Sequence, residues 1–322
     1  MVAVVLVVGA AWMFRQMDLR RLGEAFAGIH WRWLPLVVGA YLISFMIRAW
    51  RWGLLLPGEV GFGARLGADF GGFMVAFIMP LRAGEVARVW MISQWGGVRF
   101  APALGSLVVE RVLDVLVVIG ALAWVFSGAQ NVPFWMTGAA RGLVVIACLG
   151  MVGLAAVYGW RIRFEKWCMA WFPQAEGTAK WRMGIGRLAM GVLEGVAAVK
   201  SPARWMVAVV GSVVLWAMFA LMYQFGIPMM GIDAPDHAGI AVMVMVALAV
   251  AAPGPPGFLG TFQAGCIAAL ALYGVGKEQA LSYSIIMHAI QAAVLLPAGW
   301  WALHAHHVKL GEAKAAMNHP RD

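Results

Sequence analysis

Residues 77–116 read FIMPLRAGEVARVWMISQWGGVRFAPALGSLVVERVLDVL. The apolar sequence is interrupted at Pro80, and charged side chains follow in two groups, Arg82, Glu85 and Arg88, then Glu110, Arg111 and Asp114. Ionisable groups at membrane depth cost several kcal/mol, so they are kept mainly where they pair or line a polar cavity. We therefore expect the functional site in this stretch.

Outside this stretch the chain is strongly apolar. Of its 322 residues, 63% are hydrophobic and 12% are charged, and the mean hydropathy is +0.81. Apolar runs near the length of a bilayer crossing recur along the whole chain. This composition predicts an all-α, polytopic helical membrane protein, with residues 1–322 forming a single integral-membrane domain.

The apolar runs give nine expected crossings. These are 2–14, 33–56, 66–80, 103–126, 141–160, 203–223, 238–252, 258–274 and 281–303. Lys and Arg concentrate in 161–204 and recur in the tail 305–322, whereas 127–140 and 224–237 contain neither. Because basic loops stay on the cytoplasmic side, we expect the N-terminus outside and the C-terminus in the cytoplasm of a bacterial inner membrane.

One loop conflicts with this orientation. Residues 48–65 contain Arg48, Arg51 and Arg65, yet the count of crossings places them outside. The formal net charge of +9 otherwise fits loops beside an anionic leaflet, so we expect membrane lipids rather than nucleic acid as partners.

The segment 161–204 is too long and too polar for a turn. Ile185, Leu188, Val192, Val196 and Val199 recur at three- and four-residue intervals within it. That pattern predicts an amphipathic helix lying along the membrane surface. We interpret the segment as a cytoplasmic connector with a structural role.

Two expected crossings end in helix breakers. The first ends at Pro80, and the second runs into Pro253, Gly254, Pro255, Pro256 and Gly257. Proline removes a helix donor, and broken backbone at bilayer depth is tolerated only inside protein or beside a water-filled cavity. Breaks in corresponding places of two halves are typical of transporters and indicate two broken or re-entrant elements, with an inverted repeat as a hypothesis. The alternative is that 250–260 is a tight turn between two short helices.

The charged groups have helical spacing. Glu110 and Asp114 are four residues apart and share a helix face, and Arg82, Glu85 and Arg88 follow at three-residue intervals. Two such clusters of mixed sign would interlock into one buried network, and arginine donors left over would bind a phosphate. The sequence is equally compatible with a salt-bridge network that only fixes helix packing.

The sequence lacks the motifs of common nucleotide and metal sites. The sequence contains no GxxxxGK[ST] phosphate loop, no HExxH and no paired cysteines, so we expect neither a cofactor nor a metal site. We interpret His288, alone on an apolar run, as a core histidine. Asp69, the acid within 66–80, would either pair with an arginine or face a cavity.

Several of these motifs together resemble a known family. PLRAGEVARVWMI (80–92) followed by SLVVERVLDVL (106–116), with RAWRW (48–52) before them and PGPPGFLGTF (253–262) after them, is similar to the membrane domain of the lysylphosphatidylglycerol synthase and flippase family. That family includes stand-alone members, some associated with hopanoid biosynthesis. The resemblance runs from the second expected crossing to the last.

The resemblance implies movement of a lipid between leaflets. It assigns Arg82, Glu85, Arg88, Glu110, Arg111 and Asp114 to the family's charged core, and residues from Pro253 to Gly260 to its second broken hairpin. Many members carry a glutamate shortly after these glycines, where this chain has Gln263. The chain ends soon after its last expected crossing, so we expect no synthase domain.

We therefore expect a lipid transporter or flippase for a lipid with a polar or anionic headgroup. Two other classes stay open, namely a membrane transferase acting on a lipid-linked substrate and a non-transporting scaffold of a lipid-synthesis complex. A homo-oligomer or a lipid-biosynthesis partner is compatible with the sequence.

Overall fold

The computed structural model describes residues 28–79, 83–128, 180–199, 201–251 and 255–306, with isolated positions between 138 and 166. The described helices are η1 (Trp31–Trp33), α3 (Leu34–Leu55), α4 (Phe62–Ile78), α5 (Ala83–Trp95), α6 (Phe100–Gly128), α9 (Lys180–Val196), α10 (Pro202–Met229), α11 (Ala238–Ala251), η2 (Pro256–Phe258), α12 (Thr261–Ala271) and α13 (Lys277–Ala305). These parts of the chain contain no strand. The all-α prediction is confirmed.

Within the described part of the chain, three helices are long and apolar enough to cross a membrane, namely Trp31–Leu55, Pro202–Met229 and Lys277–Ala305. α6 is as long as these, with 29 residues, but it carries three charged side chains of the polar centre, Glu110, Arg111 and Asp114. The structure is therefore that of a polytopic membrane protein. The expected crossing 2–14 lies outside the described residues, and 141–160 does so almost entirely.

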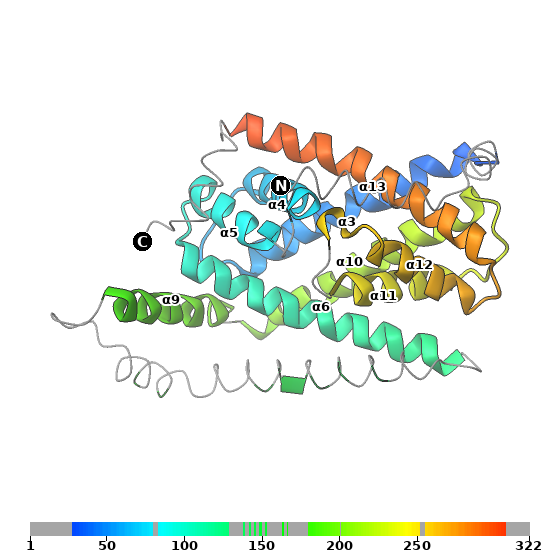
Figure 1. Ribbon diagram of the computed structural model, residues 1–322. Coiled ribbons are helices and arrows are strands. Elements are labelled where there is room, and N and C mark those ends of the chain that lie inside the picture. The colour runs from blue at the N-terminus through cyan, green and yellow to red at the C-terminus, as the bar shows by residue number, and fades with distance from the viewer. Residues whose placement is uncertain are drawn as a thin grey trace.

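α3 and α10 run antiparallel, which defines two ends of the bundle. The His30 N–H donates to the Met229 carbonyl oxygen over 2.8 Å, and the Trp33 ring stacks on Phe225 at 6.1 Å. The end of α3 and the start of α10 therefore lie together, at the end where α9 packs against the start of α6 (Figure 1). We call this the α9 end, and the opposite one the far end.

This arrangement corrects the expected placement of residues 48–65. Arg48 and Arg51 belong to α3 rather than to a loop, and the residues that follow α3 lie at the α9 end, beside the basic connector. The crossing count put them on the opposite side because it treated every apolar run as a complete crossing.

α4 and α5 form a hairpin of short helices that starts from the α9 end. Their backbones approach closely at two glycines, since a Cβ on Gly84 would lie 2.2 Å from the Gly72 carbonyl oxygen. The expected crossings do not include α5, because its charged residues hide it from a hydropathy average, although the three-residue spacing of those charges indicated a helix after Pro80. The turn between the two helices, with Pro80 and Arg82, lies outside the described residues.

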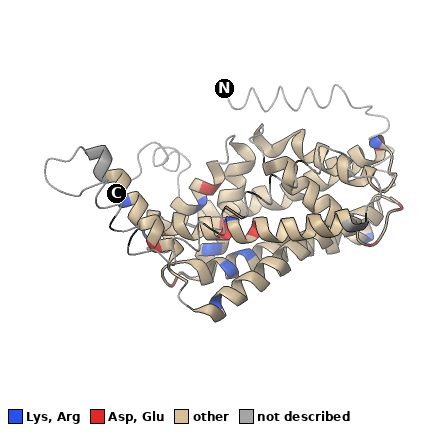
Figure 2. Cartoon of the chain, turned by 90° about the horizontal axis from the view of Figure 1, so that it is seen from below, with Lys and Arg blue, Asp and Glu red and all other residues tan. Residues whose placement is uncertain are grey.

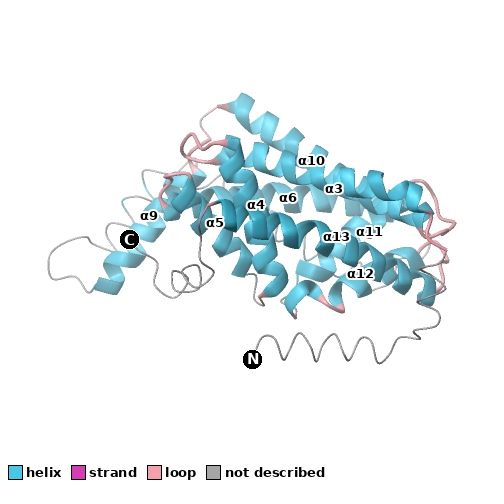
Figure 3. Ribbon diagram, turned by 90° about the horizontal axis from the view of Figure 1, so that it is seen from above, coloured by secondary structure: helices cyan, strands magenta, loops and turns pink. Residues whose placement is uncertain are grey.

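α11 and α12 form a second hairpin, which starts from the far end (Figure 3). The two helices of this hairpin also approach each other closely at a glycine, since a Cβ on Gly265 would lie 2.8 Å from the Val246 Cα. Between the helices the chain turns through η2, with positive φ at Gly257 (67°) and Gly260 (86°). Pro253 and Gly254 lie outside the described residues.

The tips of the two hairpins meet inside the bundle. A Cβ on Gly257 would lie 3.4 Å from the Phe77 carbonyl oxygen, near the end of α4. Two pairs of short helices thus start from opposite ends and contact each other at their tips. The tight-turn alternative for 250–260 remains open, because residues 252–254 lie outside the described residues; it did not include this contact with the first hairpin.

The connector contains the expected helix, α9. Val196 and Val199 are buried, and Gly191 and Gly195 lie against the start of α6. Ile185 and Leu188, on the predicted apolar face, are exposed. The apolar face therefore packs on α6 only over its second half.

Candidate functional site

The polar centre of the molecule is built around one carboxylate. Glu110 of α6 is fully buried and accepts two hydrogen bonds from Arg88 of α5, over 2.8 and 3.0 Å. Arg111 donates to it over 2.5 Å and Arg48 of α3 over 3.3 Å. Arg51 Nη2 lies 3.4 Å away. Four guanidinium groups thus surround a single acid.

Two further acids complete the network. Asp114 Oδ1 accepts from Arg51 Nη1 over 2.5 Å and from Trp216 Nε1 of α10 over 3.2 Å. Arg51 also donates to Ser212 Oγ over 2.6 Å. Asp69 of α4 contacts Arg88 Nε. The network therefore joins α3, α4, α5, α6 and α10, and Figure 2 shows its charged residues in the middle of the bundle.

The ion pairs join as many acids as arginines. They link four arginines, Arg48, Arg51, Arg88 and Arg111, to four acids, Asp69, Glu85, Glu110 and Asp114. Burying such ions is costly unless they are paired and hydrogen-bonded, which explains the dense pairing. Among the four arginines, Arg111 has the most exposed side chain, at 35%.

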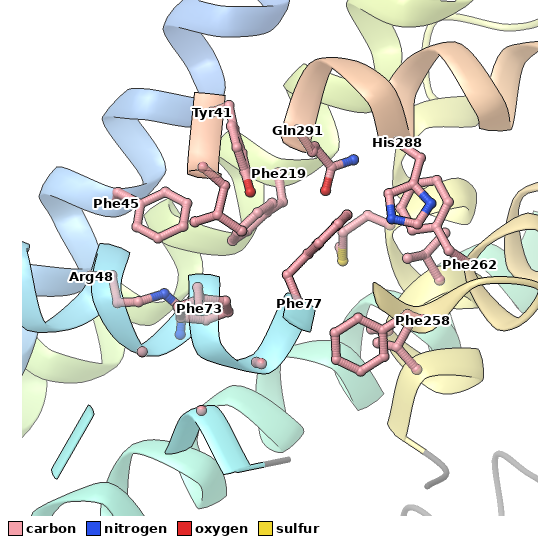
Figure 4. A pocket seen from close by; sticks show the side chains of 18 of the residues that line it. Tyr41, Phe45, Arg48, Phe73, Phe77, Phe219, Phe258, Phe262, His288 and Gln291 are labelled. Carbon is pink, nitrogen blue, oxygen red and sulfur yellow. The ribbon is translucent and has the colours of Figure 1, made fainter. Parts of the chain in front are cut away.

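A cavity of about 270 Å³ opens beside this network. Arg48, Arg88, Arg111 and Glu85 line one part of it, and Arg111 Nη1 lies 3.8 Å from Glu85 Oε1. The remaining wall is mainly aromatic, formed by Tyr41, Phe45, Phe73, Phe77, Trp216, Phe219, Tyr223, Phe258 and Phe262. Figure 4 shows most of these rings around the cavity. The Arg48 guanidinium lies 4.9 Å from the centre of the Phe73 ring, a cation–π contact.

The second hairpin closes the other side of the cavity. Gln263 Oε1 accepts from the Gly260 N–H over 2.7 Å, and its amide nitrogen lies 3.2 Å from His288 Nδ1 of α13. The His288 ring contacts Phe262 at 4.7 Å and Phe77 at 5.2 Å. Gln263 therefore caps α12 and links it to α13, while His288 links both hairpins.

The structure brings together four of the six predicted charged residues, Arg88, Glu110, Arg111 and Asp114, and places Glu85 at the edge of the group. Arg82 lies outside the described residues. Asp69 takes the first of its two expected roles and pairs with an arginine.

Sequence reasoning missed the contribution of α3. Arg48 and Arg51 were assigned to a loop, although both are buried partners of the acids on α6. Their three-residue spacing within RAWRW was the available signal, because it places both guanidinium groups on one helix face.

Long apolar helices around a buried arginine–carboxylate network and an adjoining cavity define a polytopic helical membrane protein with a polar centre. The family model described as the lysylphosphatidylglycerol synthase TM region matches residues 1–299. The chain belongs to this family, as its motifs suggested. Searches of curated proteins and of solved structures gave no match.

Proposed function

We propose that this protein is a lipid transporter that moves a lipid with an anionic headgroup between the leaflets of the bacterial inner membrane. The observation that carries the proposal is the cavity, which lies where two opposed hairpins meet and is lined by three arginines, Arg48, Arg88 and Arg111. A headgroup needs such a polar place in the hydrocarbon region, because its transfer into bare lipid is costly.

The charges favour an anionic rather than a cationic headgroup. Three arginines, Arg48, Arg88 and Arg111, line the cavity against one acid, Glu85, and Arg111 is the most exposed of these arginines. An arginine fork binds a phosphate through two parallel hydrogen bonds. The phosphate would lie at Arg111 and Arg48, and the aromatic wall would contact the rest of the headgroup.

The charges at the two ends favour a cytoplasmic α9 end. The α9 end holds Arg65, Arg99, Arg187 and Arg204 with the acids Glu59 and Glu194, whereas the far end holds only two Lys or Arg among its described residues, Arg32 and Lys277, with Asp233, Asp236 and Glu278. Because basic residues stay in the cytoplasm, the end of α13 and the C-terminal tail that follows would be cytoplasmic.

The hairpins supply a route for alternating access. They start from opposite ends and meet at their tips, so withdrawal of either one would open the cavity to one side of the membrane. Gly257 and Gly260, with positive φ, are the hinge positions of the second hairpin. The Gln263–His288 contact would hold this hairpin closed.

The test is lipid translocation in vesicles that contain only the purified protein. Phosphatidylglycerol with a fluorescent headgroup is added to both leaflets, and dithionite then bleaches label that reaches the outer surface. We expect bleaching beyond the outer-leaflet half, and a loss of about tenfold or more in the rate with Arg111→Gln, the scale of one lost charged hydrogen bond.

Arg99→Gln is the matched control, because Arg99 is exposed and pairs with Glu194 on the surface. Equal rates for the two variants and the wild type would contradict the proposal. Mass spectrometry of the recovered lipid distinguishes a transporter from a transferase, since a transporter returns its lipid chemically intact.

A further inference from the structure

An apolar groove lies between α6, α10 and α11, on the other side of Trp216 from the cavity. Its volume is about 750 Å³, within the usual range of ligand sites. Small side chains leave the space open, namely Gly120 and Ala121 on α6 and Ala217 and Ala220 on α10.

The groove and the cavity share part of their lining. Trp216 and Met243 line both. Trp216 is held in place by its hydrogen bond to Asp114, and Ser212, which lines the groove, accepts a hydrogen bond from Arg51. The wall between the two spaces is thus fixed by the charged network itself.

The groove opens toward the outside of the bundle. Val213, Ala217 and Leu221 on α10 and Gly120 on α6 are exposed, and we expect them to face hydrocarbon in a bilayer. Along α10 the groove runs from Val209 to Gln224, about 22 Å at 1.5 Å per residue. One leaflet's share of the hydrocarbon core is about 15 Å, so the groove is long enough to follow a lipid chain.

We propose that this groove binds a hydrocarbon chain of the same lipid whose headgroup occupies the cavity, with Trp216 between the two parts. The proposal rests on the function proposed above and adds the place where the lipid tail lies during transport. The bound class is then an amphiphile with a flexible linear chain beside an anionic group.

The groove would guide the chain rather than supply affinity. Membrane lipid is as apolar as the groove lining, so moving a chain from one to the other gains little hydrophobic free energy. The groove instead keeps the chain beside the headgroup cavity. Filling the groove should therefore slow transport without displacing the headgroup from Arg111.

The experiment uses phosphatidylglycerol with a photoactivatable diazirine in one acyl chain, in vesicles containing the full chain. After illumination, peptide mapping locates the adducts. We expect them on the groove-lining parts of α6 and α10, and we expect both Arg111→Gln and Ala217→Trp to reduce them at least fivefold. If the adducts are lost in Arg111→Gln, the labelled acyl chain belongs to a lipid whose headgroup is bound in the cavity, and not to bulk lipid around the protein.

Val210→Trp is the matched control, because Val210 is exposed on α10 but does not line the groove. It should leave both the adducts and the translocation rate unchanged. Ala217 is exposed, so tryptophan there leaves the core packing intact, which a thermal unfolding curve verifies.

Photolabelling does not require transport, so the experiments can refute the transporter proposal and the groove proposal independently of each other. Arg111-dependent adducts without translocation would retain the groove and refute the transporter. Translocation that Ala217→Trp leaves unchanged would refute the groove and retain the transporter. Adducts spread evenly over the outer faces, or no adducts in the groove, would also overturn the groove proposal.

Discussion

Replacing Glu110 with glutamine should destabilise the fold strongly. Glu110 is fully buried and is the shared acceptor of Arg48, Arg88 and Arg111. Without its charge, the network holds four arginines against three acids, Asp69, Glu85 and Asp114, so one positive charge has no counter-charge. The amide nitrogen of glutamine is also a donor that faces other donors.

The magnitude follows from the burial. Removing one partner of a buried ion pair costs about 3–5 kcal/mol, which corresponds to roughly two to three and a half orders of magnitude in the folding equilibrium constant. Glu194→Gln is the matched control, since Glu194 pairs with Arg99 on the surface, with side chains 47% and 73% exposed. An exposed pair contributes less than about 1 kcal/mol.

The assay is reversible unfolding in mixed detergent micelles, followed by tryptophan fluorescence. We expect Glu110→Gln to lower the free energy of unfolding several times more than Glu194→Gln does. A double variant with Arg111→Gln restores the charge balance and should recover part of the loss. If Glu110→Gln behaves like the surface control, or if the double variant shows no recovery, the coupled network described above is refuted.

Two glycine predictions use the same assay. Gly84→Ala should destabilise the hairpin of α4 and α5 by more than about 1 kcal/mol, because the new Cβ would lie 2.2 Å from the Gly72 carbonyl oxygen. Gly39→Ala is its control: a Cβ there would have nothing within 4 Å, so this variant should be neutral or stabilising. Gly257→Ala should cost about 1–3 kcal/mol, since its φ is 67°, whereas Gly276→Ala, at φ −59°, should cost little. Equal losses within either pair would contradict these assignments.

Much of the fold was predictable because it follows from local patterns. Apolar runs of bilayer length gave the all-α polytopic class, and the spacing of Glu110 and Asp114 predicted a common helix face. The prolines and glycines at 253–257 predicted a break, and the chain does turn there through Gly257.

The remainder depends on contacts between distant segments. Arg48 pairs with Glu110 across 62 residues and Arg51 with Asp114 across 63, and no helical periodicity carries that information. Counting charges in loops also misassigned Arg48 and Arg51, since hydropathy cannot show whether an arginine ends a helix or is buried within it. The meeting of Phe77 with Gly257 likewise follows only from the packed arrangement.

The central claim is that the lipid headgroup crosses through the cavity, and blocking the cavity tests it most directly. Ala247 of α11 lines the cavity, so Ala247→Trp would fill much of its volume without changing any charge. Ala123→Trp makes the same substitution on the exposed face of α6 and is the control.

The measurement is the rate of phosphatidylglycerol translocation in vesicles, with unfolding curves showing that both variants are folded. We predict that Ala247→Trp reduces the rate to near that of protein-free vesicles while Ala123→Trp retains the wild-type rate. A folded Ala247→Trp variant that translocates lipid as fast as the wild type would show that the headgroup takes another path and would contradict the account.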